Sequence, residues 1–252
     1  MQSNSEIRKT ARERLSGNWG AAVGIVLFVF VIQMIIETVC GALDNLFNSQ
    51  ILYTPFPHVP PGTPIKVIGL FGTVSGIVSV LIYIGVLWIS IDLARGGKLS
   101  FKVEEILQAF TSKISWKVVI TYVLVLIYTT LWSLLLIVPG IIKGISYSLT
   151  FYIFKDNPDL SPNEAITLSR KMLDGYKQQV FRLSLSFVGM GLVIFIIAMI
   201  LISAMGLTNS GSDTVAIILI MLPTILWLAP YMYTSLAIFY DDVKRNYESA
   251  KV

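Results

Sequence analysis

Charged residues are scarce in this chain, and so are the residue types that most often bind metals or form disulfides. Only 13% of the 252 residues are Asp, Glu, Lys or Arg, against roughly 25% in soluble domains. There is one cysteine, Cys40, and one histidine, His58. A single cysteine excludes an internal disulfide and paired-thiol motifs. The lone histidine sits in a proline-rich stretch without the partners that a metal site needs.

The chain is instead rich in long apolar runs. Hydrophobic residues make up 55% of the chain, and the mean hydropathy is +0.74. A helix needs about 20 apolar residues to cross a bilayer. The sequence therefore predicts an all-α fold, a polytopic membrane helix bundle with six transmembrane helices in a single integral membrane domain, residues 1–252. The predicted spans are residues 19–40, 67–94, 116–138, 139–154, 180–205 and 214–240.

The third and fourth spans form one long apolar stretch that must turn. Residues 116–154 are too long for a single crossing at about 1.5 Å per residue. Pro139 and Gly140 predict a hairpin turn, because proline removes a backbone donor and glycine permits a sharp bend. The fourth span is only about 24 Å long by the same rise. A re-entrant element is therefore the alternative to a full crossing.

Positive charge follows this arrangement of spans. Every Lys and Arg except Lys66 and Lys143 falls before the first span, after the sixth span, or in the second-to-third or fourth-to-fifth connection together with the first three residues of the span that follows it. These segments all lie on one side of a six-span chain with a hairpin at Pro139. The positive-inside rule then predicts that both termini are cytoplasmic.

Two charged residues lie within predicted spans, near their outer ends. Lys143 is about one turn inside the fourth span, and Glu37 is near the end of the first. Lys143 can extend its long side chain to the headgroups. Alternatively, Lys143 and Glu37 form a polar pair that is structural or lines an outward-facing cavity.

Two polar segments resemble each other. SNSEIRKTARERLSGNWG, residues 3–20, and SPNEAITLSRKMLDGYKQ, residues 161–178, both open with Ser-x-x-Glu. This pattern is a capping box, and each segment also carries a glycine where its helix is expected to stop. The sequence predicts three parallel repeats, each an amphipathic helix followed by a span hairpin, at approximately residues 1–94, 99–154 and 160–240. Convergence of short helix starts is the alternative.

The amphipathic helices carry basic residues beside an apolar edge. Such a helix suits the headgroup layer of a membrane, with its cations toward anionic lipid headgroups. The alternative is a helix that packs against the cytoplasmic ends of the spans. The residues expected to face lipid are Arg8, Arg12, Arg14, Trp19, Arg170 and Lys171.

Catalytic and cofactor motifs are not found in the sequence. It has no H-E-x-x-H, G-x-S-x-G, Walker A or dinucleotide-binding pattern. We therefore expect no enzyme activity, no cofactor and no metal. The formal net charge of +4 needs no nucleic-acid partner, because the positive-inside bias accounts for it.

Three stretches resemble a known family. They are SEIRKTARERLSGNWGAAV at 5–23, LLIVPGIIKGISYSLTFYIFKDNPDLSPNEAITLSRKMLDGYK at 135–177 and LAPYMYTSLAIFYDD at 228–242. They resemble bacterial integral membrane proteins catalogued as domain of unknown function nine hundred and seventy-five. That family is similar to the membrane domain accompanying some glycerophosphodiester phosphodiesterases. The resemblance implies a multi-pass protein of the bacterial plasma membrane, and it supplies no catalytic residues.

These observations favour a non-enzymatic membrane protein in envelope or lipid homeostasis, or a partner module for another membrane protein. Its expected partners are the lipid bilayer, with anionic headgroups, and a second membrane protein. A transporter or exporter component for a peptide or lipid is the alternative. A membrane-embedded enzyme is the third hypothesis, and it has the least support because catalytic groups are missing from the sequence.

Overall fold

The structure is a computed structural model that describes residues 1–47, 51–53, 64–66, 69–99, 101–111, 114–204 and 213–250. Strands β1 (Ile51–Tyr53) and β2 (Pro64–Lys66) form one short antiparallel pair. The rest of the regular structure in these ranges is helical. The helices are α1 Asn4–Leu15, α2 Trp19–Leu46, α3 Leu70–Ala94, α4 Val103–Ile106, α5 Gln108–Thr111, α6 Ser115–Leu135, α7 Ile137–Tyr147, α8 Thr150–Asp156, α9 Pro162–Met172, α10 Lys177–Ala204 and α11 Asp213–Ser249.

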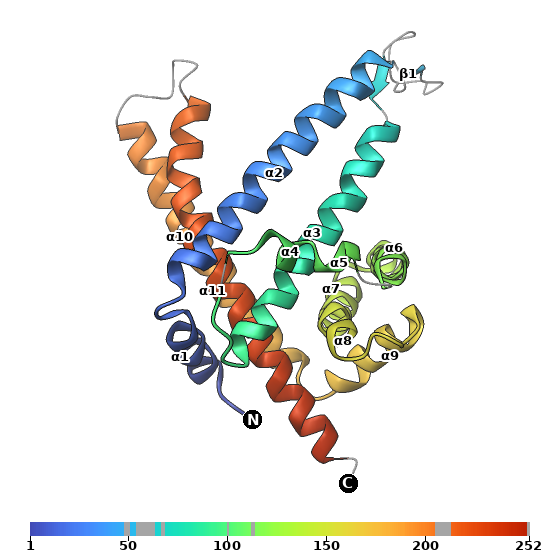
Figure 1. Cartoon of the computed structure of the whole chain (residues 1–252), viewed down its shortest axis with the longest axis vertical. Coiled ribbons are helices and arrows are strands. Elements are labelled where there is room, and N and C mark those ends of the chain that lie inside the picture. Colours follow the sequence, from blue (N-terminus) through green and yellow to red (C-terminus); the bar gives the residue numbers. More distant parts are fainter. Residues whose placement is uncertain are drawn as a thin grey trace.

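Two long helical hairpins, α2–α3 and α10–α11, form the frame of the molecule (Figure 1). Helix α11 packs against both α2 and α3, so the two hairpins share one core. The strands lie at the upper end of the α2–α3 hairpin, while α1 and both chain termini lie at the lower end. One end of the molecule therefore gathers the termini and the short polar helices.

Five segments are long and apolar enough to cross a membrane, as expected of a multi-pass membrane protein. They are Trp19–Leu46, Leu70–Ala94, Ser115–Leu135, Ile137–Asp156 and Lys177–Ser203. The sixth predicted span, residues 214–240, falls on α11, and many of its side chains lie outside the described residues. The first five predicted spans thus correspond to helical segments of membrane-crossing length.

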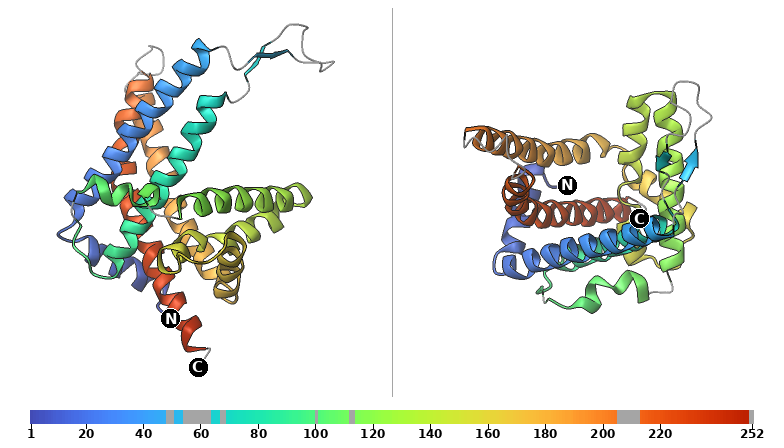
Figure 2. Two further views of the ribbon diagram at one scale, coloured as in Figure 1. Left: turned by 45° about the vertical axis from the view of Figure 1, so that its right-hand side comes forward. Right: turned by 90° about the horizontal axis from the view of Figure 1, so that it is seen from above.

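The middle hairpin runs in a different direction from the other two. Figure 1 shows α6 and α7 nearly end on, whereas α2 and α3 lie along the plane of that view. The left view in Figure 2 shows α6 running across the picture, with α3 inclined steeply to it. Helices α6 and α7 pack closely along each other, so the predicted hairpin is present but splays away from the long helices.

The sequence predicted the turn of this hairpin at Pro139 and Gly140, but the structure places it a few residues earlier in the chain. The chain reverses at Leu136, whose backbone is extended, and α7 begins at Ile137. Pro139 falls in the first turn of α7, where a missing N–H costs little because first-turn amides have no partner within the helix. A Cβ at Gly140 would overlap Ser133 of α6. The glycine therefore allows the two helices to approach closely.

The connection after α3 folds back along that helix. Gly96 has φ +95 and redirects the chain, and the one-turn helices α4 and α5 then pack against the middle of α3. Gln108 Nε2 donates to the carbonyl oxygen of Gly85 at 3.3 Å, and a Cβ at Gly85 would overlap the carbonyl oxygen of Ile106. The middle amphipathic helix expected near residues 99–117 is thus two separate turns.

The two predicted helix starts are confirmed in detail. Ser3 and Glu6 form a capping box at α1, and Ser161 and Glu164 form one at α9. In each box the Ser hydroxyl accepts from the Glu backbone N–H, while the Glu carboxylate accepts from the Ser backbone N–H. These hydrogen bonds hold the pKa of Glu6 and of Glu164 below the usual range.

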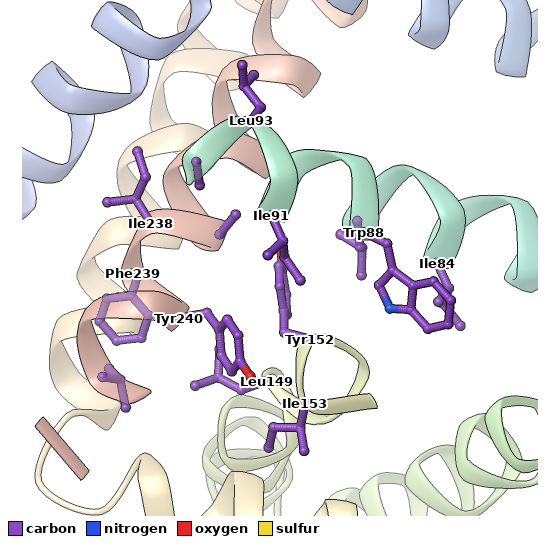
Figure 3. Close-up of a cluster of buried hydrophobic side chains, with 14 of the residues drawn as sticks. Ile84, Trp88, Ile91, Leu93, Leu149, Tyr152, Ile153, Ile238, Phe239 and Tyr240 are labelled. Atoms are coloured by element: carbon purple, nitrogen blue, oxygen red, sulfur yellow. The ribbon is translucent and has the colours of Figure 1, made fainter. Parts of the chain in front are cut away.

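A buried cluster at the lower end joins α3, α8 and α11 (Figure 3). Trp88, Ile91, Tyr152, Phe239 and Tyr240 are all buried there. Each large apolar side chain buried in this way contributes about 1.5–3 kcal/mol where water is the reference solvent. The cluster therefore packs α3, α8 and α11 together beside the polar groups at this end of the molecule.

Candidate functional site

A pocket lies between α6, α7 and α9, and it contains the lysine within the apolar stretch. The pocket has a volume of 390 Å³. Lys143 Nζ lies 4.5 Å from the centre of the Trp132 ring, a cation–π contact that holds the ammonium at the pocket wall. The lining residues are Tyr128, Trp132, Lys143, Tyr147, Asn163, Ile166, Thr167 and Arg170.

Hydrogen bonds between helices hold the walls of this pocket. The Tyr128 hydroxyl of α6 donates to Asn163 Oδ1 of α9 at 3.3 Å. The buried Ser169 hydroxyl of α9 donates to the carbonyl oxygen of Ser146 on α7 at 2.9 Å. All three helices are therefore linked around the cavity.

The pocket carries positive charge without a matching carboxylate. Lys143 and Arg170 both line it. Among the ion pairs of the described residues, neither cation has an acidic partner. Glu164, at the start of the same helix as Arg170, is committed to its capping box. Two cations beside hydroxyl and amide groups form a surface suited to an anion.

Glu37 lies elsewhere, in a polar cluster between α2 and α3. Its Oε1 accepts from Gln33 Nε2 at 2.9 Å and from the Ser75 hydroxyl at 3.4 Å. Gln33 also donates to the Ser79 hydroxyl at 2.6 Å. The sequence suggested a pair of Glu37 and Lys143, but the structure does not bring them together, because the middle hairpin carries Lys143 to α9.

The basic helix α1 packs on protein through its apolar edge. Ile7, Ala11 and Leu15 are fully buried, and α1 lies against α11. The sequence allowed this helix either to lie in the headgroup layer or to pack against the ends of the spans. Its apolar edge packs against the spans. Arg12 and Arg14 remain exposed, while Arg8 is partly buried.

The other residues expected at the lipid interface also fall into two groups, one packed on protein and one exposed. Trp19 stacks on Trp227 of α11, with ring centroids 6.5 Å apart, and so helps to join α2 to α11. Arg170 and Lys171 are exposed near the end of α9, whose opposite side buries Ala165 and Met172. The exposed cations of α1 and α9 thus project from helices that the protein core holds in place.

Sequence reasoning missed an ionic network that joins α3, α8 and α11. Arg95 donates to both oxygens of Asp156, at 2.8 and 2.7 Å, and to Asp241 at 2.8 Å. Asp156 also accepts from Lys244 at 2.7 Å and from the Tyr240 hydroxyl at 2.9 Å. Hydrogen bonds to Asp156, and then to Asp241, raise the pKa of Arg95 above its usual value.

A second ion pair lies beside this network. Lys155 Nζ is 2.5 Å from Asp92 Oδ2, and it also donates to the carbonyl oxygen of Trp88. The sequence contained a signal for both features: Asp92, Asp156 and Asp241 each follow an apolar run at the same end of the chain's spans. Their placement joins the helix ends, which is a structural role.

The described residues offer no group of three or more His, Cys, Asp or Glu side chains that could hold a metal ion. His58 lies outside the described residues. Chemically, the arrangement provides a cationic pocket on α6, α7 and α9, a polar cluster between α2 and α3, and a charged network at the end that carries the termini.

Comparison with known proteins places this chain beside one family. Residues 1–146 and 134–247 match the family described as "Protein of unknown function (DUF975)". Searches of curated proteins and of solved structures give no match. The family match spans nearly the whole chain, and it includes both the pocket and the ionic network.

Proposed function

Because the chain belongs to the DUF975 family, whose function is unknown, we propose its role from its own geometry: a non-enzymatic membrane module that binds anionic lipid. The observation that carries this proposal is the set of exposed cations on α1 and α9, whose apolar sides are fixed in the core. We assign it to envelope or lipid homeostasis in the bacterial plasma membrane, alone or as the partner of another membrane protein.

Electrostatics supports lipid as the ligand of this end of the protein. Arg12 and Arg14 are exposed on α1, and Lys171 is exposed on α9. Each basic residue near an anionic membrane surface contributes about 1 kcal/mol to its attraction. Helices α1 and α9 both lie toward the lower end of the molecule in Figure 1, so their cations can act on one leaflet.

We expect Arg12→Gln/Arg14→Gln to weaken the preference of the protein for anionic lipid several-fold. The measurement is the ratio of phosphatidylglycerol to phosphatidylcholine that co-purifies from mixed vesicles. Glu13→Gln is the matched control, because Glu13 is exposed between the two arginines. Removing its negative charge should leave the ratio unchanged or raise it. An equal ratio in the double variant and the wild type would contradict the proposal.

The proposal places both termini in the cytoplasm and takes the re-entrant alternative for residues 139–154, because the middle hairpin crosses α3 steeply (Figure 2) and brings Lys143 beside Arg170 of α9. Its support is the positive charge in the segments between alternate spans, together with the position of both termini at one end of the molecule (Figure 1). The basic residues of α1 and α9 then face the cytoplasmic leaflet, which carries the anionic lipids.

We also propose that the chain contains repeated units, each a short helix leading into a span hairpin. After their capping boxes, α1 and α9 are followed by Gly17 at φ +80 and Gly175 at φ +81. Each glycine leads into a 28-residue helix, α2 or α10. The middle unit departs from this pattern because α4 and α5 replace its leading helix.

A transporter or exporter component, for a peptide or a lipid, is the second candidate. The observation in its favour is the cluster of Gln33, Glu37, Ser75 and Ser79 between two membrane-length helices. Ionisable and polar residues within membrane spans often mark a substrate path. The exposed cations of α1 and α9, at the other end of the protein, are better explained by the lipid proposal.

A further inference from the structure

We propose that the pocket between α6, α7 and α9 binds the phosphate of one anionic glycerophospholipid, with Lys143 and Arg170 as its ligands. This inference rests on the proposed function and gives it a specific site. The basic surface of α1 attracts a leaflet, whereas this pocket selects a single headgroup. The support comes from the charge, the hydrogen-bonding groups and the apolar surroundings of the pocket.

Charge is the first support. Lys143 is partly buried on α7, within a segment of membrane-crossing length, and has no carboxylate partner among the ion pairs of the described residues. A cation in an apolar environment is costly unless a counter-charge or water stabilises it. Arg170 lines the same cavity, and arginine binds phosphate through two parallel hydrogen bonds. A phosphate between the two side chains supplies the missing negative charge.

Neutral donors around the cations fit the same ligand. Asn163 uses its Oδ1 to accept from Tyr128, so its amide N–H groups are the part of the side chain left to donate. Thr167, whose side chain carries a hydroxyl group, also lines the cavity. At 390 Å³, the cavity is within the range of small-molecule sites, about 300–1,000 Å³. It can hold a phosphate together with the polar group attached to it.

The surroundings favour a lipid over a free phosphate ion. Tyr128, Trp132 and Tyr147 form an aromatic wall, and such rings favour the boundary between headgroups and acyl chains. Ile141 and Ile142, next to Lys143 in the chain, are 50% and 45% exposed. These side chains offer an apolar surface for acyl chains beside the cationic pocket, and a free phosphate would not use that surface.

The test is native mass spectrometry of the full-length protein in detergent with phosphatidylglycerol, phosphatidylcholine or inorganic phosphate. We expect one phosphatidylglycerol to be retained per protein. Lys143→Gln and Arg170→Gln should each weaken its binding about tenfold, equivalent to about 1.4 kcal/mol. Lys143→Arg, which keeps the charge, should retain most of the affinity. Each variant must unfold at the wild-type temperature to be compared.

Lys98→Gln is the matched control. Lys98 is exposed in the connection after α3 and belongs neither to the pocket lining nor to the basic faces of α1 and α9, so its substitution should leave the retention of phosphatidylglycerol unchanged. Equal weakening by Lys98→Gln and Arg170→Gln would overturn the site. Equal retention of phosphatidylcholine, or full competition by inorganic phosphate at the lipid's own concentration, would also overturn it.

The outcome separates this inference from the proposed function. If Lys143→Gln retains phosphatidylglycerol while Arg12→Gln/Arg14→Gln loses the preference for anionic lipid, the pocket assignment fails and the proposed function stands. If the wild type shows no preference for anionic lipid in either experiment, both fail. Loss of the single retained lipid in Lys143→Gln, with the overall preference intact, supports the pocket.

Discussion

Asp156→Asn is expected to lower the free energy of unfolding by about 3 kcal/mol, as measured by denaturant unfolding in detergent. Asp156 accepts hydrogen bonds from Arg95, which follows α3, and from Tyr240 and Lys244 of α11. Breaking a buried pair by removing one partner typically costs about 3–5 kcal/mol. We take the lower end because the Arg95 side chain is 39% exposed, although that of Asp156 is only 10% exposed.

Asp159→Asn is the control for this experiment. Asp159 lies three residues further along the chain and is exposed, and its carboxylate forms no ion pair within the described part of the chain. Its substitution should change stability by no more than about 0.5 kcal/mol. If the two variants lose stability equally, the network does not join α3, α8 and α11 as described.

Gly85→Ala should be the most damaging single-methyl change in α3. A Cβ at this position would overlap the carbonyl oxygen of Ile106, so α4 must move away from α3. Adding atoms to a closely packed site typically costs about 1–3 kcal/mol, and we expect the upper end because the obstacle is backbone. Unfolding in detergent measures this loss.

Gly76→Ala, in the same helix, separates crowding from helix propensity. A Cβ at Gly76 meets nothing within 4 Å. Alanine favours the helix by up to about 1 kcal/mol over glycine, so this variant should match or exceed the stability of the wild type. Similar stabilities for Gly85→Ala and Gly76→Ala would show that α4 does not pack on the middle of α3.

Local patterns predicted much of the fold. The apolar runs anticipated the five segments of membrane-crossing length, and Ser-x-x-Glu anticipated both capping boxes. These features depend on neighbouring residues, which a single sequence displays directly. The hairpin turn was displaced to Leu136 because proline is also compatible with the first turn of a helix.

Features that depend on distant contacts could not be predicted in the same way. The fold-back of α4 onto α3 is possible because Gly85 has no side chain. A glycine within an apolar run does not by itself reveal which segment will pack against it. Lys143 meets α9 rather than Glu37 because the middle hairpin crosses α3 steeply (Figure 2), and hydropathy does not encode that direction. Arg95 and Asp241 are 146 positions apart in the chain.

The central claim is that the end carrying α1 and α9 lies at the cytoplasmic leaflet, where its cations meet anionic lipid. Labelling of single cysteines with a membrane-impermeant maleimide tests it most directly, in a chain whose Cys40 is replaced by serine. Phe47, exposed after the last residue of α2, marks the opposite end. We predict that Phe47→Cys is labelled in intact cells, whereas Arg12→Cys and Lys171→Cys are labelled only after the membrane is permeabilised. Labelling of Lys171→Cys in intact cells would contradict the account.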